Sequence, residues 1–578
     1  MSALVKRLET MALPVLRGIG RLGSFAPEPP WATGGYGLAS RGGLILLFLI
    51  GLLLSFWLTG AGLAIMIIAT MALLQFYLLQ YRGALRKRST MLWLAAVALI
   101  LGAVVAVIWS RWSGRQGVRG DVMVLGAVLG CLAGLPLVRV LFRAIFGPHH
   151  PESTLPEPQD PAPLWFWIGA VGPDRATIVA RLADGVDANS VSVEYTSEDQ
   201  IQHSGNIEVD QQRFARIELS SLDPSQHYDL RVDARRGEET VGSALGGFTT
   251  FPPAMEPSTV RLAFGSCMST GSRGTVFDTI ADTSLSSWDG PRPQLFMVTG
   301  DLHYENITAR STKPFLEAFD KVHTSPPQRR LYNSMPMAYV WDDHDYGDND
   351  SGHDSPSRDA AQTAYRLAVP SYVDPGQAGA INQEFSIGRV RVVVTDNRSE
   401  RGETPGHLLS PTQEQWLIDC ITDPTWPVVI WVSSTPWISS DDDSDNWGAY
   451  AKQRRRIADA ISTRSANLVM VSGDAHMVAI DDGRNAAYAS DGSGGFPVLQ
   501  AAALDRLGSA KGGRFSHGKF GGAGHFGIVT VKDEGGSEIE VELSARSWTG
   551  TEIVGHSFTI TVQDPSLWTP HNRQEANR

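Results

Sequence analysis

The residues with the clearest chemical potential lie in a short acidic stretch, YVWDDHDYGDND, from Tyr339 to Asp350. The stretch holds five aspartates and a histidine, and it overlaps an apolar run, MAYVW, that is typical of a buried strand. Carboxylates this close repel each other, and their burial is costly unless a positive charge lies between them. Two interpretations are open: a solvated acidic loop, or a site for cations.

Reactive side chains also follow other apolar runs. At the ends of these runs lie Cys267; Asp301 and Tyr304; Asp342, Asp343, His344 and Asp345; Asp396 and Arg398; and Asp474 and His476. Oxygen, imidazole, phenolate and thiolate ligands together suit a hard transition metal ion beside a second divalent ion. A carboxylate such as Asp301 can bridge two ions about 3.5–4 Å apart. The residue types therefore favour a dinuclear metal centre, in which cations would neutralise the aspartates.

Six apolar strands would position these side chains. They are VRLAFGSC (260–267), QLFMVTGD (294–301), MAYVWDDHD (337–345), VRVVVTDNR (390–398), VVIWVSSTPW (428–437) and NLVMVSGDAH (467–476). Continuous apolar runs are typical of strands covered on both faces, and open α/β sheets bind ligands beyond the carboxyl ends of their strands. We therefore expect these strand ends to converge in space.

Residues 164–253 have a different pattern, with short alternating strands such as TIVARLA and HYDLRVDAR separated by turns. This pattern predicts an immunoglobulin- or fibronectin-like β-sandwich. The segment holds no cluster of titratable residues suited to catalysis, so we expect a structural or positioning role. Residues 148–163 carry six prolines, which predict a stiff, extended linker ahead of the sandwich.

The first 150 residues carry 14 lysines and arginines but only three acids. Long uncharged runs separate these charged residues. As one helix, Gly42–Tyr81 would be about 60 Å long, twice the thickness of a bilayer core. We expect two membrane spans there, a third at Met91–Ser110 and a fourth at Val122–Val138, so that residues 42–147 form transmembrane helices in contact with membrane lipid.

The predicted topology makes the chain a multi-pass integral protein of the cell membrane. Basic residues in the 1–41 segment and around Arg86 place both on the cytoplasmic side, and four spans return the chain there. The loop with Arg111, Arg115 and Arg119 disagrees with this topology. The charge rule therefore favours, but does not fix, a cytoplasmic catalytic domain.

Composition excludes some other classes of function. The basic excess flanks the apolar runs rather than a folded body, so no nucleic-acid-binding surface is expected. Three cysteines make no disulfide framework. Nothing in the sequence predicts an oligomeric state.

Taken together, several motifs resemble those of the PhoD-like alkaline phosphatases, in the calcineurin-like metallophosphoesterase superfamily. They are FGSC (264–267), GDLHY (300–304), WDDHDYGDND (341–350), TDNR (395–398), DNWGAY (445–450) and SGDAH (472–476). The resemblance covers about residues 165–560. It implies an α/β metallophosphoesterase domain, a layered αββα sandwich, over residues 258–562, followed by a tail at 563–578. The expected membrane segments lie outside it.

The resemblance also implies roles for single residues. Asp301 would bridge two metal ions. Cys267, Tyr304 and His476 would complete the shell of a ferric ion, and Asp343 and Asp474 would bind a second metal, calcium or another divalent ion. His344 would face the substrate phosphate instead of binding metal. At the end of the strand 428–437, where the family usually has a further ligand, the chain offers Ser434 or Thr435 but no histidine.

The expected reaction is hydrolysis of a phosphate ester, either a monoester or a diester. A water shared by two cations loses a proton near neutral pH, and the resulting hydroxide would attack phosphorus in line. His344 would protonate the leaving oxygen or stabilise the transition state. Arg398 and Arg401 are candidates to grip phosphate oxygens, although Arg398 could pair with Asp396 instead.

Two other functions compete with hydrolysis. One is a catalytically inactive, phosphatase-like binding or scaffold protein. The other is a small membrane transporter with a regulatory soluble domain. Charges inside membrane spans usually mark a transport path, and the predicted spans contain none. They therefore favour an anchor over a transporter.

Overall fold

The computed structural model describes residues 151–156, 162–198, 200–282, 284, 290–373, 379–439, 445–462, 467–501, 503–506 and 512–562. The expected amino-terminal segment (1–41), transmembrane helices (42–147) and carboxyl-terminal tail (563–578) lie outside these residues. Among the helices that are described, none has the length and apolar character needed to cross a bilayer.

The described part of the proline-rich segment is docked on the folded body. Glu152 pairs with Gly274 in an isolated antiparallel bridge, and the Ser153 amide donates to the Arg273 carbonyl at 2.7 Å. The backbone of residues 151–153 is therefore bonded to the domain that follows, and the extended linker over residues 148–163 stays a prediction.

Two antiparallel sheets form the β-sandwich expected at 164–253. One has the order β1 (Leu164–Gly169), β2 (Arg175–Leu182), β5 (Phe214–Ser220), and the other β4 (Gln200–Glu208), β3 (Ser190–Ser197), β6 (His227–Arg236), β7 (Glu239–Thr249). Buried and exposed residues alternate along β5, as in a strand with one face on a core. The sandwich is confirmed, while its immunoglobulin- or fibronectin-like subtype stays a prediction.

The larger part of the described chain contains two mixed sheets. The first has the order β10 (Met337–Val340), β9 (Leu295–Thr299), β8 (Thr259–Gly265), β18 (His525–Lys532), β19 (Glu538–Ser547), β20 (Glu552–Thr561). The second has the order β11 (Gln383–Ile387), β12 (Val390–Thr395), β13 (Val428–Ser433), β14 (Leu468–Ser472), β16 (Val498–Ala501), β15 (Met477–Asp481), β17 (Lys519–Gly521).

All six predicted strands are present, three in each sheet. β8, β9 and β10 run parallel in the first sheet, and β12, β13 and β14 run parallel in the second. β15 and β16 pack against β18 and β19, so the two sheets face each other. The carboxyl ends of both parallel groups can therefore meet at one place.

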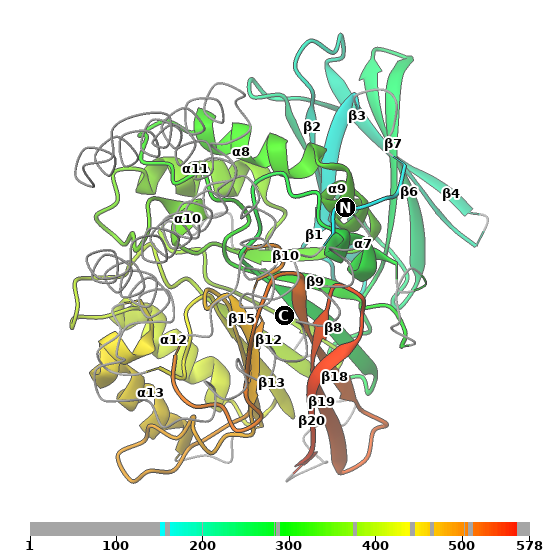
Figure 1. Ribbon diagram of the computed structural model, residues 1–578. Helices are drawn as coiled ribbons and strands as arrows, with labels where there is room; N and C mark the ends of the chain where they lie inside the picture. Colours follow the sequence, from blue (N-terminus) through cyan, green and yellow to red (C-terminus); the bar gives the residue numbers. More distant parts are fainter. Residues whose placement is uncertain are drawn as a thin grey trace, which may run out of the picture. The chain divides into compact units, whose positions relative to one another are not determined.

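Helices cover the sheets. They are α7 (Thr275–Ala281), α8 (Lys313–Thr324), α9 (Pro326–Ser334), α10 (Asp343–Tyr346), α11 (Arg358–Ala368), α12 (Pro411–Thr422) and α13 (Ala451–Ser462), with a 3-10 turn, η2 (Trp447–Tyr450). α12 and α13 share an apolar core with the second sheet, on its side away from β18–β20 (Figure 1).

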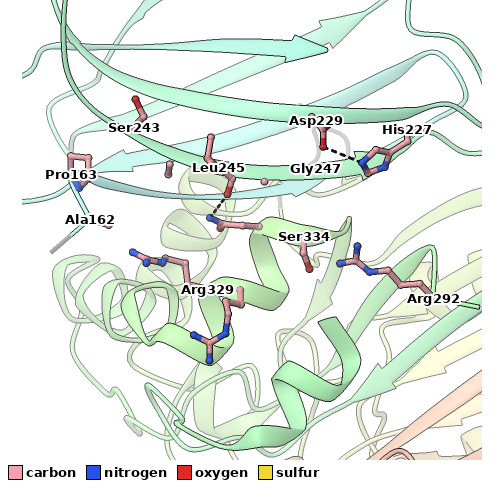
Figure 2. A pocket seen from close by; sticks show the side chains of 14 residues that line it. Ala162, Pro163, His227, Asp229, Ser243, Leu245, Gly247, Arg292, Arg329 and Ser334 are labelled. Atoms are coloured by element: carbon pink, nitrogen blue, oxygen red, sulfur yellow. Dashed lines mark hydrogen bonds and ion pairs between the residues drawn. The ribbon is translucent and has the colours of Figure 1, made fainter. Parts of the chain in front are cut away.

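The sandwich and the larger domain share contacts through α8 and α9. Trp165 Nε1 donates to Asp320 Oδ1 at 2.8 Å, and Asn333 Nδ2 donates to the Leu245 carbonyl at 3.2 Å. Beside the second contact lies a cleft of about 610 Å³ between β7 and α9, with Arg329 among its lining residues (Figure 2). The cleft lies at the amino ends of β9 and β10, away from the strand ends that carry the candidate ligands.

His323 on α8 is buried between the two domains. Its ring stacks on Trp165 with centroids 4.3 Å apart and meets the edge of Trp167 at 4.6 Å. Neither ring nitrogen has a hydrogen-bond partner in the described part of the chain, and the residue is 1% exposed. Burial lowers the pKa of His323 from 6.5 to about 3, because an imidazolium there would lose its hydration.

This histidine predicts an acid-sensitive domain interface. The unfolded chain protonates His323 below pH 6.5, whereas the folded chain does so only near pH 3. Folding stability should therefore fall as the pH drops through this window, by about 1.4 kcal/mol per pH unit from this residue. We expect His323→Phe to remove that contribution, as measured by urea unfolding at pH 7 and pH 5.

His303 is a second buried histidine, with a pKa lowered to about 4. It remains in the variant, so part of the acid sensitivity should persist. Equal loss of stability between pH 7 and pH 5 in the wild type and in His323→Phe would contradict the prediction.

Candidate metal centre

Three candidate ligands lie at sharp reversals of the backbone. Cys267 after β8, Asp301 after β9 and Asp474 after β14 have φ angles of 57°, 55° and 60°. L-residues rarely adopt this left-handed conformation, and such strain is found mostly where a functional site requires it. The strands therefore end abruptly, and their terminal side chains are held close to the sheet edge.

Two glycines allow the strand ends to approach. A side chain at Gly300 would place its Cβ 2.5 Å from Asp342 Cβ, and one at Gly473 would place its Cβ 2.2 Å from the Thr299 carbonyl oxygen. Gly473 belongs to the second sheet and Thr299 to the first. This close approach brings SGDAH against GDLHY.

The first group of side chains that could hold a metal contains Cys267, Asp301 and His476. Their ligand atoms all lie within 4.8 Å of one another. Tyr304 joins them, because its hydroxyl donates to Asp301 Oδ2 at 2.5 Å and lies 2.9 Å from His476 Nε2. The four residues predicted to surround the ferric ion are thus adjacent, and the identity of the ion stays a prediction.

A second group contains Asp301, Asp343 and His344, again with ligand atoms within 4.8 Å of one another. Asp301 is common to both groups, as a bridging carboxylate would be. His344 was expected to face the substrate, yet it lies close enough to Asp343 to be a ligand. Asp474 is in none of the ligand groups found among the described residues, and its carbonyl accepts from Cys267 Sγ at 3.5 Å.

The environment of Asp301 fits a bound cation. The residue is 1% exposed, and its Oδ1 has no hydrogen-bond partner in the described structure. Burial first, and then the charges of Asp343, Asp342 and Asp345, raise the pKa of Asp301 well above its usual value. A cation would relieve this cost, and the sulfur, nitrogen and oxygen donors present suit a transition metal.

Comparison with known proteins agrees with this geometry. Residues 292–500 match a family model described as PhoD-like phosphatase. Residues 292–500 are therefore similar to a PhoD-like phosphatase domain. No curated protein sequence matches the chain. The match confirms the resemblance that the motifs predicted and supports a phosphoric ester hydrolase.

Two solved structures share the fold. A structure of PhoD has a TM-score of 0.52 at 16% identity, covering 71% of this chain and 92% of that one. A purple acid phosphatase, PPD1 from yellow lupin (Lupinus luteus) seeds, has a TM-score of 0.51 at 14% identity, with 71% and 76% covered. The α/β phosphoesterase fold expected for residues 258–562 is confirmed, whereas identities this low carry no further detail.

Asp345 of the PhoD-like domain holds three segments together. Its Oδ2 accepts from the Leu302 amide at 2.8 Å and the Tyr339 hydroxyl at 2.6 Å, and its Oδ1 accepts from the Asp342 amide at 2.6 Å. These bonds fix the turn that carries Asp343 and His344. Asp345 therefore orients its neighbours.

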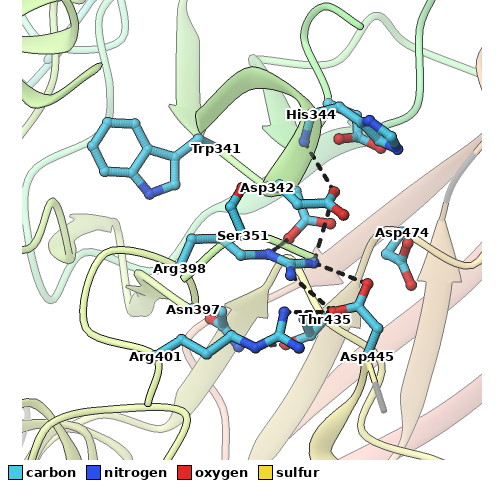
Figure 3. A network of polar contacts seen from close by, with 12 residues as sticks. Trp341, Asp342, His344, Ser351, Asn397, Arg398, Arg401, Thr435, Asp445 and Asp474 are labelled. Carbon is cyan, nitrogen blue, oxygen red and sulfur yellow. Dashed lines mark hydrogen bonds and ion pairs between the residues drawn. The ribbon is translucent and has the colours of Figure 1, made fainter. Parts of the chain in front are cut away.

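Arg398 of the domain is fully buried and pairs with carboxylates. Its Nε donates to Asp342 Oδ1 at 2.6 Å and its Nη1 to Asp445 Oδ1 at 2.8 Å, while its Nη2 lies 3.8 Å from Asp343 Oδ1 (Figure 3). The alternative ion pair with Asp396 is wrong, because the group of Arg398 that donates to Asp396 Oδ1 is its backbone amide and not its guanidinium. The predicted phosphate contact has no support in this geometry.

Arg401 also pairs with Asp445, at 2.7 Å, and its Nε donates to the Tyr450 hydroxyl at 2.9 Å. Asp445 and Asp350 lie in the motifs DNWGAY and WDDHDYGDND, and the sequence indicated no role for either. Both lie with Asp343 in a third group of closely spaced carboxylates. Their only sequence signal was membership of the acidic motifs, because nothing in the sequence indicates which acids meet arginines.

The end of β13 offered Ser434 or Thr435. Thr435 Oγ1 accepts from Asn397 Nδ2 at 2.5 Å. Ser434 Oγ is buried without a described partner, and a Cβ at Gly300 would lie 3.3 Å from Ser434 Cβ. Ser434 is therefore the oxygen at this end that remains available to the centre.

The buried arginine generates a prediction about stability. Arg398→Met would leave the buried Asp342 without its counter-charge and the half-buried Asp445 with Arg401 alone, which should reduce the free energy of unfolding by about 3–5 kcal/mol. Urea unfolding at pH 7 would measure the change. As a control, Arg484→Met removes an ion pair to Asp482 whose arginine side chain is 72% exposed, and it should cost less than about 1 kcal/mol. Losses of similar size in both variants would contradict this role for Arg398.

Proposed function

We propose that this chain is a metal-dependent phosphoesterase whose centre is shared between the two sheets. One observation carries the proposal: two ligand groups meet at a single buried carboxylate, Asp301, that lacks a partner for one oxygen. In this proposal Cys267, Tyr304 and His476 hold Fe³⁺ with Asp301.

The second ion in this proposal is Ca²⁺ or another divalent metal. Asp301 would bridge to it, and Asp343 would bind it together with Asp474. Ser434 is a further oxygen donor of suitable position, because it lies beside Gly300 at the same sheet edge. Bound metal ions would lower the pKa of a bound water and neutralise charge on a phosphate ester. The proposal assigns both of these effects to the metal ions.

In this proposal His344 moves a proton. Its Nδ1 lies 2.5 Å from Asn306 Oδ1, so Nδ1 carries a hydrogen when it donates to that amide oxygen. Nε2 is then the nitrogen that exchanges a proton with the leaving oxygen. Burial lowers the pKa of His344, although Asp343 opposes the shift.

Arg398 and Arg401 have a different role in this proposal from the one the sequence suggested. Because Asp445 accepts from both guanidinium groups, they hold Asp445 in place. Burial raises the pKa of Asp342 to about 6, and Arg398 opposes this shift. Contacts to the phosphate would then come chiefly from His344 and the metal ions.

We also propose, from the apolar runs within residues 42–147 alone, that the enzyme is tethered to a membrane. The charge distribution around these runs favours the cytoplasmic side for the catalytic domain. The substrate class is a phosphate ester, with no preference assigned between monoesters and diesters.

Replacing the shared carboxylate tests the enzyme. Asp301→Asn should lower kcat/KM for an aryl phosphate at least about 100-fold, the scale of several kcal/mol of lost charge stabilisation. Asp491→Asn, at an exposed site, is the matched control. Elemental analysis of both variants should show metal loss only in the first. Unchanged hydrolysis in Asp301→Asn would exclude catalysis at this site and favour the scaffold interpretation.

A second test concerns the identity of the ligands. Iron-loaded protein should show a visible tyrosinate–ferric charge-transfer band, which Tyr304→Phe should abolish. Tyr372→Phe, whose hydroxyl bonds the Val171 carbonyl in the domain interface, should retain the band. A band that survives in Tyr304→Phe, or is absent from active iron-loaded enzyme, would refute iron ligation by Tyr304.

A further inference from the structure

The ring of Tyr304 is covered on both faces. The His344 imidazole stacks on it with centroids 4.1 Å apart and planes inclined by 29°. The Arg506 guanidinium carbon lies 3.8 Å from the same ring centroid. Two planar groups cannot both lie about 4 Å from one centroid on the same face without overlapping, so His344 and Arg506 lie on opposite faces.

Arg506 is far from Cys267 in the sequence but lies next to it in space. Its backbone amide donates to the Cys267 carbonyl at 3.2 Å, and the Leu504 amide donates to the Ser266 carbonyl at 3.0 Å. The Asp505 carboxylate also accepts from the Ser269 amide. The segment 503–506 is thus hydrogen-bonded to the loop that carries the candidate ligand Cys267. These bonds restrict the positions that the Arg506 guanidinium can reach.

The polar groups of Tyr304 and His344 also have hydrogen-bond partners. The Tyr304 hydroxyl contacts Asp301 and His476, as described above, and the Tyr304 amide donates to Thr270 Oγ1 at 3.0 Å. Among the described residues, the hydrogen-bond partner of the His344 ring is Asn306, at Nδ1. One face of the His344 imidazole therefore packs on the Tyr304 ring, and Arg506 packs on the other face of that ring.

We infer that Arg506 is a positioning residue that clamps Tyr304 against His344, so that a metal ligand and the proton-moving imidazole are held as one stacked unit. The inference rests on the proposed function for its catalytic consequence, but the clamp itself is a property of the side chains. A guanidinium suits this place because it is planar, permanently charged and attracted to an aromatic face.

The experiment compares Arg506→Met, Arg506→Lys and, as a matched control, Arg484→Met in the full-length protein. Crystal structures of the metal-free variants report the position of Tyr304 directly. In Arg506→Met we expect the phenol ring to leave its stack with His344, and in Arg506→Lys to keep it in part, because an ammonium retains the attraction but not the planar contact.

Two solution measurements accompany the structures. In the iron-loaded protein the tyrosinate band should shift or weaken in Arg506→Met and recover partly in Arg506→Lys. For aryl phosphate hydrolysis, kcat should fall about 10-fold or more, as for other residues that orient a metal ligand, with KM changed less than about twofold. Arg484→Met should match the wild type throughout.

Several results would overturn the inference. One is a Tyr304 ring that stays in place in Arg506→Met with an unchanged band and kcat. Another is a rise in KM at constant kcat, which would make Arg506 a direct contact of the substrate. If the wild type hydrolyses no phosphate ester, the proposed function fails, and the position of Tyr304 in the metal-free structures still decides the clamp.

Discussion

Buried negative charge is the constraint on which the rest of this structure depends. Asp301, Asp342, Asp343 and Asp345 are all 3% exposed or less, and ionised carboxylates at such depth require compensation. The protein itself compensates two of them, Asp342 and Asp345, but not Asp301. Arg398 faces Asp342, backbone and hydroxyl donors face Asp345, and Asp301 has no ion pair with a basic side chain in the described part of the chain. The absence of a counter-charge at Asp301 is what marks the place for a cation.

Because of this constraint, the buried arginines serve as counter-charges to aspartates. A guanidinium could serve a phosphatase by gripping the substrate, but in this chain Asp445 accepts from both Arg398 and Arg401. A buried arginine used as a permanent counter-charge is not available to bind and release a phosphate in each turnover. The protein's own cations therefore hold these acidic side chains, and in the proposed function catalysis is left to bound metal ions and to His344.

The centre also depends on parts of the chain outside the most recognisable region. The family model spans residues 292–500, yet Cys267 precedes that range and Arg506 follows it. β18 returns to pair with β8, and segment 503–506 is bonded to the loop after β8. The amino-terminal and carboxyl-terminal parts of the catalytic domain thus meet at the ferric side of the proposed centre. His323, packed between Trp165 and Trp167, ties the β-sandwich to the same body.

The sequence by itself determined that apolar strands end in metal-binding side chains, because strand-forming runs and ligand types are local properties of the chain. It identified Cys267, Asp301, Tyr304, Asp343 and His476 before any coordinates, together with the β-sandwich and the phosphatase family. It did not predict the docking of residues 151–153, the pairing of Arg398 with Asp445, or the stack of Arg506 on Tyr304. Only the tertiary structure decided these, since each joins segments whose separation along the chain carries no information about their distance in space. The position of an arginine relative to a carboxylate follows from how two sheets pack, and that packing is a collective result of the whole core.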